Sequence, residues 1–278
     1  MIPTKKPFFI SQQNKTQLDK ILATRTKHPI NILVKGRHGM GKSELARQIA
    51  TTQNMDYVPV PIGSLQETGQ LMGRYELIGG ETRFMEGKFP KAVKTPNTLI
   101  HLEELNRPES PKALNDLFPL LDDGRSIIHE QLGEIGVANG VVFVATLNEG
   151  FEYTGIDPLD AALEDRFHII RLDYLPPQME STLILTRTGL AGEKTTRLLQ
   201  FVNKLRMDGQ DPIHVSTRRC IMMAELVVAG LDLQQAIVAN VALDLDKLES
   251  ILLHFDFAGQ GMTNGATTGP DTSRWVVL

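Results

Sequence analysis

The chain has 278 residues, of which 41% are hydrophobic and 22% charged, a composition typical of soluble globular proteins that excludes disorder as the default. Its net charge of −4 lacks the basic excess that favours non-specific nucleic-acid binding, although a local basic surface stays open. One cysteine, Cys220, excludes an internal disulfide, and no run reaches the roughly 18 apolar residues of a membrane span, so we expect a cytoplasmic protein with a buried thiol and no membrane partner.

A glycine-rich turn lies between a predicted strand and a predicted helix near the start of the chain. After a polar segment with helical spacing at 14–25, the apolar run 32–35 predicts a buried strand. Residues 36–43 follow the pattern GxxxxGK[ST], and 44–50 have helical spacing, which is the context that a phosphate-binding loop requires. The residues predicted to bind the nucleotide are Gly36, Arg37, His38, Gly39, Met40, Gly41, Lys42, Ser43 and Glu44.

The chemistry of this loop points to a nucleoside triphosphate. Backbone N–H groups of such a turn converge on phosphate oxygens, and the helix N-terminus behind them adds roughly half a unit of positive charge. The ammonium group of Lys42 would reach the β- and γ-phosphates, and the hydroxyl of Ser43 would bind magnesium. Four apolar side chains are candidates for a wall against the base, with ordinary packing as the alternative: Phe8, Phe9, Ile10 and Ile30.

A glycine- and proline-rich insertion interrupts the next part of the chain. The run 57–62 predicts a second strand, and Ser64 is expected to cap a helix over 65–72. Between residues 73 and 97, glycine turns flank an extended run, which predicts an inserted hairpin before a helix resumes at 89–94. An ordinary long loop is the alternative, but loops of this length usually carry a function.

Two apolar strands end in polar side chains that we expect to share one edge of a sheet. The strand 98–102 ends at Glu103 and Glu104, and the strand 140–146 ends close to Asn148. Parallel sheets bind ligands at the carboxyl ends of their strands, so we place the catalytic edge here. The other elements predicted in this region are a helix at 106–121, a hairpin of 126–129 with 132–137, a helix at 158–167 and a fifth strand at 168–172.

Pro176 and Pro177 separate two kinds of periodicity. Strands alternate with helices before them, and helical spacing continues after them to about residue 255. We therefore predict an α/β nucleotide-binding domain over residues 1–175, a smaller helical lid domain over 176–258 and a C-terminal tail over 259–278. The tail is rich in Gly and Thr, and where its last four residues dock stays open.

Five short segments follow one another along the chain, namely 36–43, 102–107, 148, 165–167 and 216–218. Their series resembles the AAA+ ATPases of the MoxR group, in particular the CbbQ, NorQ and GvpN branch, which is related to dynein-like AAA modules. The resemblance covers residues 30–230. It implies an AAA+ phosphate-loop core with a parallel sheet flanked by helices, followed by a small helical lid. The insertion at 73–97 looks like the helix-2 insert of that clade, which lines a ring surface that contacts substrate or partner.

The resemblance assigns roles to the residues at the strand ends. Glu104 matches the glutamate that orients and polarises the attacking water, and Asn148 matches sensor 1, which hydrogen-bonds the γ-phosphate or that water. A strand-end asparagine is otherwise often part of a turn. Glu103 stands where most relatives have the aspartate that, with Ser43, holds magnesium. A longer carboxylate still reaches a hydrated metal, so we expect an altered affinity and not inactivity.

Two arginines match positions that act on the nucleotide. Arg166 corresponds to the arginine finger, which completes the site of the neighbouring subunit and is worth about 10³-fold or more in rate. A helix-end salt bridge is the alternative. Arg218 corresponds to sensor 2, but Arg219 is adjacent and the choice between them stays open. Arg107 and Arg125 are weaker candidates, with interface or structural roles.

A finger that acts in trans leaves one chain incomplete, so the resemblance implies a ring, hexameric in the family, with ATP and Mg²⁺ as cofactors. The expected activity is remodelling or activation of a client protein, often with a partner that carries a von Willebrand factor A domain. One alternative is a nucleic-acid motor or restriction-type NTPase subunit, and another is a scaffold that binds nucleotide with little turnover. Basic residues of the insert would favour the motor: Arg74, Arg83, Lys88, Lys91 and Lys94. The seven histidines show no metal-ligand spacing.

Overall fold

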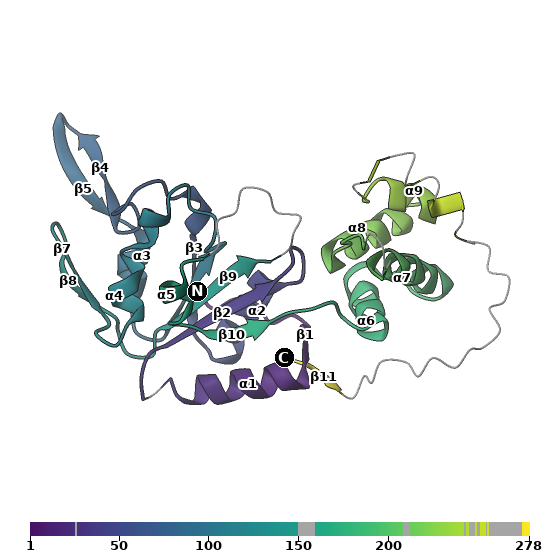
Figure 1. Ribbon diagram of the computed structural model, residues 1–278, viewed down its shortest axis with the longest axis horizontal. Coiled ribbons are helices and arrows are strands. Elements are labelled where there is room, and N and C mark those ends of the chain that lie inside the picture. The colour runs from purple at the N-terminus through teal and green to yellow at the C-terminus, as the bar shows by residue number, and fades with distance from the viewer. Residues whose placement is uncertain are drawn as a thin grey trace. The chain divides into compact units, whose positions relative to one another are not determined.

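The computed structural model describes residues 1–25, 27–149, 159–207, 212–241, 243–244, 248, 251–253, 255 and 274–278 (Figure 1). The chain divides into two compact units. The first combines Met1–Arg37, Lys42–Leu172 and Val276–Leu278, and the second combines His38–Gly41 with Asp173–Trp275. The tip of the glycine-rich loop thus groups with the second unit, while both of its flanks belong to the first.

A five-stranded parallel sheet forms the centre of the first unit. Its strands, in order across the sheet, are β10 (His168–Arg171), β2 (Ile30–Gly36), β9 (Val142–Asn148), β6 (Thr98–Glu103) and β3 (Asp56–Pro61). The strands β2, β9 and β6 are buried almost throughout, as is usual for parallel strands covered on both faces. The five predicted strands are present, and the parallel sheet flanked by helices confirms the predicted fold class.

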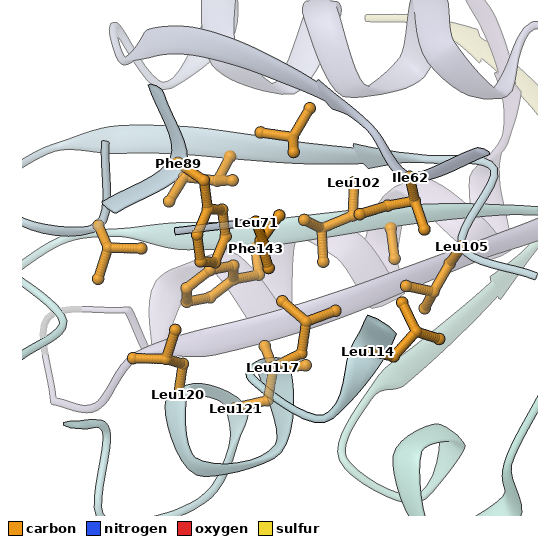
Figure 2. Close-up of a cluster of buried hydrophobic side chains, with 14 of the residues drawn as sticks. Ile62, Leu71, Phe89, Leu102, Leu105, Leu114, Leu117, Leu120, Leu121 and Phe143 are labelled. Carbon is orange, nitrogen blue, oxygen red and sulfur yellow. The ribbon is translucent and has the colours of Figure 1, made fainter. Parts of the chain in front are cut away.

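Alternate residues of the central strands point to opposite faces of the sheet and build two apolar clusters. On β2, Leu33 joins one cluster, while Ile32 and Val34 join the other. The first cluster contains Phe89 and Phe143, whose ring centres lie 6.4 Å apart (Figure 2). The helices of this unit are α1 (Gln12–Ala23), α2 (Lys42–Thr52), α3 (Lys88–Val93), α4 (Leu117–Leu121) and α5 (Ala161–Glu164).

Two β-hairpins extend from the first unit. They are β4 (Gly73–Ile78) with β5 (Glu81–Glu86), and β7 (Ser126–His129) with β8 (Gly133–Gly136). The two hairpins lie side by side, since the rings of Phe84 and His129 are 5.3 Å apart (Figure 1). Both predicted hairpins are confirmed, and α3 follows the first as expected.

The helix predicted at 65–72 is wrong. A single 3₁₀ turn, η1 (Ile62–Ser64), precedes this stretch, which consists of bends and turns. The hydroxyl of Ser64 donates to the backbone oxygen of Pro61 at 3.0 Å and does not cap a helix. Gly69 has φ +89°, which is left-handed backbone that ends a helix. Local turn bonds therefore outweigh the helical spacing here.

Two further helices are shorter than predicted. The helix predicted at 106–121 is divided into η2 (Pro111–Leu114) and α4, because prolines such as Pro108 have no N–H to continue a helix. In the stretch 158–167, α5 begins after Asp160, whose carboxylate accepts from a backbone N–H two residues on at 2.7 Å. Residue 158 itself lies outside the described residues.

The last residues of the chain pair with its first strand. β11 (Trp275–Val277) and β1 (Phe9–Ser11) form a two-stranded sheet, and Leu278 N–H donates to the backbone oxygen of Phe8 at 3.0 Å. Val276 and Leu278 pack against the second buried cluster, so the docking place that the sequence left open is the N-terminal strand.

Three candidates for an adenine wall are buried in the same cluster: Phe8, Ile10 and Ile30. Ordinary packing accounts for these three.

Helices surround a third apolar cluster in the second unit. They are α6 (Pro177–Thr188), α7 (Glu193–Arg206), α8 (Thr217–Val228) and α9 (Leu233–Val238).

Arg206 and Glu180 form a buried bidentate ion pair with distances of 2.8 and 2.9 Å. Cys220 lies in the same core, and burial raises the pKa of its thiol, as expected for a structural cysteine. In the described part of both units, no helix is long and apolar enough to cross a membrane.

Candidate nucleotide-binding site

The glycine-rich loop connects the end of β2 to the beginning of α2. Lys42 is buried, and its ammonium group donates to the backbone oxygens of Gly36 and Arg37 at 2.7 Å each. Gly39 has φ +71°, and a Cβ there would lie 2.4 Å from the hydroxyl oxygen of Ser216. Only glycine fits this position. The loop therefore joins a buried cation to the N–H groups of a helix start, which suits phosphate binding.

Glu104 adopts a backbone conformation that is rare for a residue with a side chain. Its φ is +55°, in the left-handed region. Its N–H donates to the hydroxyl oxygen of Thr146 on β9 at 3.3 Å. Its carboxylate accepts from the Asn148 amide at 3.3 Å and from Arg107 at 3.2 Å. Because β6 and β9 are neighbours in the sheet, the structure brings Glu104 and Asn148 together.

A cavity of about 860 Å³ opens at this edge of the sheet. Ser43, Glu103 and Glu104 line it, so one hydroxyl and two carboxylates face the same space. Mg²⁺ prefers hard oxygen ligands and keeps several of its waters, so this donor set fits the magnesium ion of a nucleoside triphosphate. Among the described residues, no group of three or more His, Cys, Asp and Glu forms a site that could hold a metal by itself.

Arg166 lies between α5 and β10. Its guanidinium donates to the Asp122 carboxylate at 2.8 Å and to the backbone oxygen of Ala162, and it lies 5.2 Å from the ring centre of Phe118. The hydrogen bond from Arg166 lowers the pKa of the Asp122 carboxyl. In its own chain Arg166 thus makes a helix-end ion pair, and its action on a neighbouring subunit stays a prediction.

The two weaker arginine candidates have different surroundings. Arg125 donates to the side-chain oxygen of Asn31 at 2.7 Å and to the backbone oxygen of Pro29 at 3.0 Å. These bonds fasten a turn to the start of β2, which is a structural role. Arg107 instead forms an ion pair with Glu104, and both side chains are exposed by 47%.

Arg218 and Arg219 point to different neighbours at the start of α8. A Cβ built on Gly39 would lie 3.4 Å from the Cβ of Arg218, so Arg218 flanks the tip of the glycine-rich loop. Arg219 donates to the backbone oxygen of Asn240 at 2.8 Å, and its N–H is capped by Ser216. The second arginine therefore belongs to the helical core, while the first is placed beside the loop.

Two family matches cover most of the chain. Residues 31–167 match the AAA domain of the dynein-related subfamily, and residues 180–247 match the CbbQ/NirQ/NorQ C-terminal domain. A protein of Thauera aromatica described as putative chaperone BssE is 43% identical over 253 residues, which cover 91% of this chain and 88% of that protein. The chain belongs to the MoxR-like AAA+ ATPases.

Other relatives of this AAA+ ATPase come from the same group. Protein NorQ of Paracoccus denitrificans is 28% identical, over 84% of this chain and 85% of that protein. The denitrification regulatory protein NirQ of Stutzerimonas stutzeri is 26% identical, over 85% of each. A mutant of RuvB from Thermotoga maritima superposes with a TM-score of 0.55 and 16% identity, over 92% of this chain and 74% of that one. At that identity the RuvB structure shows the AAA+ fold alone.

The sequence did not indicate that His214 of this AAA+ ATPase contacts the loop, or that Tyr174 supports His214. His214 donates from Nε2 to the backbone oxygen of His38 at 3.1 Å, and the Tyr174 hydroxyl bonds to its Nδ1. The rings of His38 and His214 lie edge to face, with centres 4.3 Å apart. A single histidine without a motif gives no signal in sequence. Its place two residues before the helix cap Ser216 was the only available hint.

Proposed function

We propose that the protein is a ring-forming ATPase that hydrolyses ATP to remodel or activate a client protein. One observation carries this proposal: the carboxylate of Glu104 and the amide of Asn148 meet at the end of the sheet, in a residue pair 44 positions apart. Glu104 also lines the cavity that contains Ser43 of the phosphate loop. A base, a polar sensor and a phosphate loop at one sheet edge are the parts that hydrolysis of a γ-phosphoryl group needs.

Each residue of the site has a defined task in this proposal. Lys42 and the loop N–H groups hold and neutralise the phosphates. Glu104 orients the attacking water and takes its proton. Asn148 holds the carboxylate of Glu104 and hydrogen-bonds the γ-phosphate or the attacking water. Ser43 and Glu103 would hold magnesium, which when bound neutralises phosphate charge. Arg218, beside the loop tip, is the proposed sensor 2.

The exchange of Glu104 for Gln tests the hydrolysis. Glutamine keeps the shape but cannot take a proton, so ATP binding should persist while turnover falls by about 10²-fold or more. Glu109→Gln is the matched control, since Glu109 lines the same cavity but lies on the exposed side. Undiminished hydrolysis by the Glu104 variant would remove the assignment. Slow turnover by the wild-type protein would instead favour a scaffold that binds nucleotide with little hydrolysis. Glu103, which stands in place of the usual aspartate, would then be the residue that weakens the site.

A ring of subunits, six in number, is part of the proposal. AAA+ proteins typically assemble, and Arg166 would complete the site of a neighbour. The side chain of Arg166 is 25% exposed, so part of it lies at the surface of its own chain. An arginine that meets transition-state charge is worth about 10³-fold or more in rate.

Client activation is supported by the relatives' descriptions as a putative chaperone and a denitrification regulatory protein. A partner with a von Willebrand factor A domain remains part of the proposal. Nucleic-acid binding is less well supported, because three of the basic residues of the insert are already paired with glutamates: Arg74 with Glu76, Arg83 with Glu81 and Lys94 with Glu86. A salt-sensitive shift on DNA would revive that alternative.

A further inference from the structure

A fully buried histidine lies directly behind the two carboxylates of the site. His101 is on β6, between β3 and β9, and has 0% exposure. Its Nδ1 is 2.7 Å from the hydroxyl of Tyr57, and its Nε2 is 3.2 Å from the hydroxyl of Thr146. The carboxylate of Glu103 lies 3.5 Å from Nδ1. Both ring nitrogens are therefore engaged inside the sheet.

The environment keeps this imidazole neutral. Burial, with a smaller contribution from the charge of Arg47, lowers the pKa of His101 to about 3. A neutral imidazole has one N–H donor and one acceptor nitrogen, and a hydroxyl can serve either. In one tautomer Nε2 accepts from the Thr146 hydroxyl, and in the other it donates to the hydroxyl oxygen, so the ring holds the Thr146 side chain in either case. Because both ring nitrogens are held by hydroxyl groups, the ring has a role in orientation.

Thr146 connects His101 to the bend at Glu104. Its hydroxyl oxygen accepts from Glu104 N–H at 3.3 Å, and its backbone oxygen accepts from Leu105 N–H at 2.9 Å. These two bonds hold the residue whose φ is +55°. Left-handed backbone of this kind persists at functional sites only where the surroundings impose it. The side chain of Thr146 is buried, so no water replaces the bond if the hydroxyl is lost.

We propose that His101 and Thr146 are positioning residues for Glu104, which act on the rate of hydrolysis and not on nucleotide affinity. This inference rests on the proposed function. The chain from Tyr57 through His101 and Thr146 orders the backbone at Glu104, and the backbone aims the carboxylate. Neither residue lines the described cavity. The bond from Glu104 N–H to the Thr146 hydroxyl is the route by which both residues act on the carboxylate of Glu104.

The sharpest test compares Thr146→Val with Thr146→Ser, because valine keeps the shape and serine keeps the hydroxyl. Thr146→Val should lower kcat about tenfold, as expected for one lost hydrogen bond, with the Kd for ATP unchanged. Thr146→Ser should stay within about twofold of the wild type. Wild-type kcat in Thr146→Val, or a raised Kd at unchanged kcat, would overturn the inference.

His101→Phe extends the test to the second residue of the chain. It should lower kcat to a similar extent, and the double variant with Thr146→Val should be no slower than the worse single variant, since both break one chain. Additive losses would contradict this. Ile100→Val, a buried change on the same strand, is the control and should leave kcat unchanged. If His101→Phe does not fold, the Thr146 pair decides.

The outcomes separate this inference from the proposed function. Undiminished hydrolysis in Glu104→Gln would overturn both. Loss of hydrolysis in Glu104→Gln with wild-type kcat in the Thr146 and His101 variants would overturn the positioning role alone.

Discussion

The carboxylate of Asp122 accepts a hydrogen bond of 2.8 Å from the guanidinium of Arg166, across 44 residues of sequence. The same guanidinium lies 5.2 Å from the ring centre of Phe118 on α4. Asn31 donates to the backbone oxygen of Arg166 at 2.8 Å from inside β2. Side chain and backbone of this arginine are thus both fixed within one chain, so it is oriented before a second subunit arrives.

Mixing two inactive variants should restore hydrolysis. Arg166→Ala keeps its own Glu104 but offers no finger, and Glu104→Gln keeps its finger but has no base. In a mixed ring about a quarter of the sites pair an intact Glu104 with an intact Arg166 of the neighbour. We expect steady-state hydrolysis to rise well above that of either variant alone.

The control for this mixture is the double variant, which carries Arg166→Ala and Glu104→Gln in one chain. Mixed with either single variant, it should give no hydrolysis, because every site then lacks the same residue. Full activity of Arg166→Ala by itself, or a monomer at saturating ATP and magnesium in light scattering, would contradict an arginine that acts in trans.

Replacing Asp122 with Asn should lower the melting temperature near neutral pH. Arg166 lowers the pKa of this carboxyl in the folded protein, so the pair contributes stability above the ordinary Asp pKa of about 3.9 and loses it as pH falls through the lower folded value. The difference in Tm between wild type and Asp122→Asn should therefore shrink below about pH 4.

Thermal unfolding followed by circular dichroism from pH 7 to pH 3 measures this difference. Asp123→Asn removes the same charge from the adjacent position and should show little change. An Asp122→Asn difference that is constant over the whole range would mean that charge pairing with Arg166 is not its source.

Stability should also depend on His101 in mild acid. Its pKa falls from 6.5 to about 3 on folding, so below pH 6.5 the unfolded chain binds a proton that the folded chain does not. The free energy of unfolding should therefore fall by about 1.4 kcal/mol for each unit by which the pH drops below 6.5. His101→Gln should flatten the decline, as measured by urea unfolding at pH 7, 6 and 5.

His28→Gln, which removes an exposed histidine, is the matched comparison and should keep the wild-type slope. Equal slopes in the wild type and His101→Gln would show that His101 is not buried in its neutral form.

Arg206→Met should destabilise the helical unit strongly. The Arg206 and Glu180 side chains are only 3% and 0% exposed, and removing the cation leaves a buried carboxylate without compensation, at a cost of about 3–5 kcal/mol. Adding Glu180→Met should recover most of that loss, because neither charge then remains. Chemical denaturation of the three variants measures both effects.

Arg197→Met provides the contrast, since its partner Glu193 is 76% exposed and a solvated pair should be worth about 1 kcal/mol or less. Similar losses for Arg197→Met and Arg206→Met would argue against burial as the cause.

Features that depend on neighbours in sequence were predictable from the chain alone. The phosphate loop needs a strand, glycines and a helix start within a dozen positions, and Gly36–Ser43 meets that need locally. Apolar runs marked the five strands, and glycine turns marked both hairpins. The roles of Glu104, Asn148 and Arg166 came from the resemblance to AAA+ proteins and not from spacing.

Contacts between distant segments were decided by the tertiary structure. The helix expected at 65–72 is absent because turn bonds and Gly69 compete with its spacing. The pairing of β11 with β1 had no local sign. His101, Thr146 and Glu104 meet only because β6 and β9 are adjacent strands. A hydrogen bond between side chains on different strands depends on strand order and register, which no periodicity along a single segment encodes.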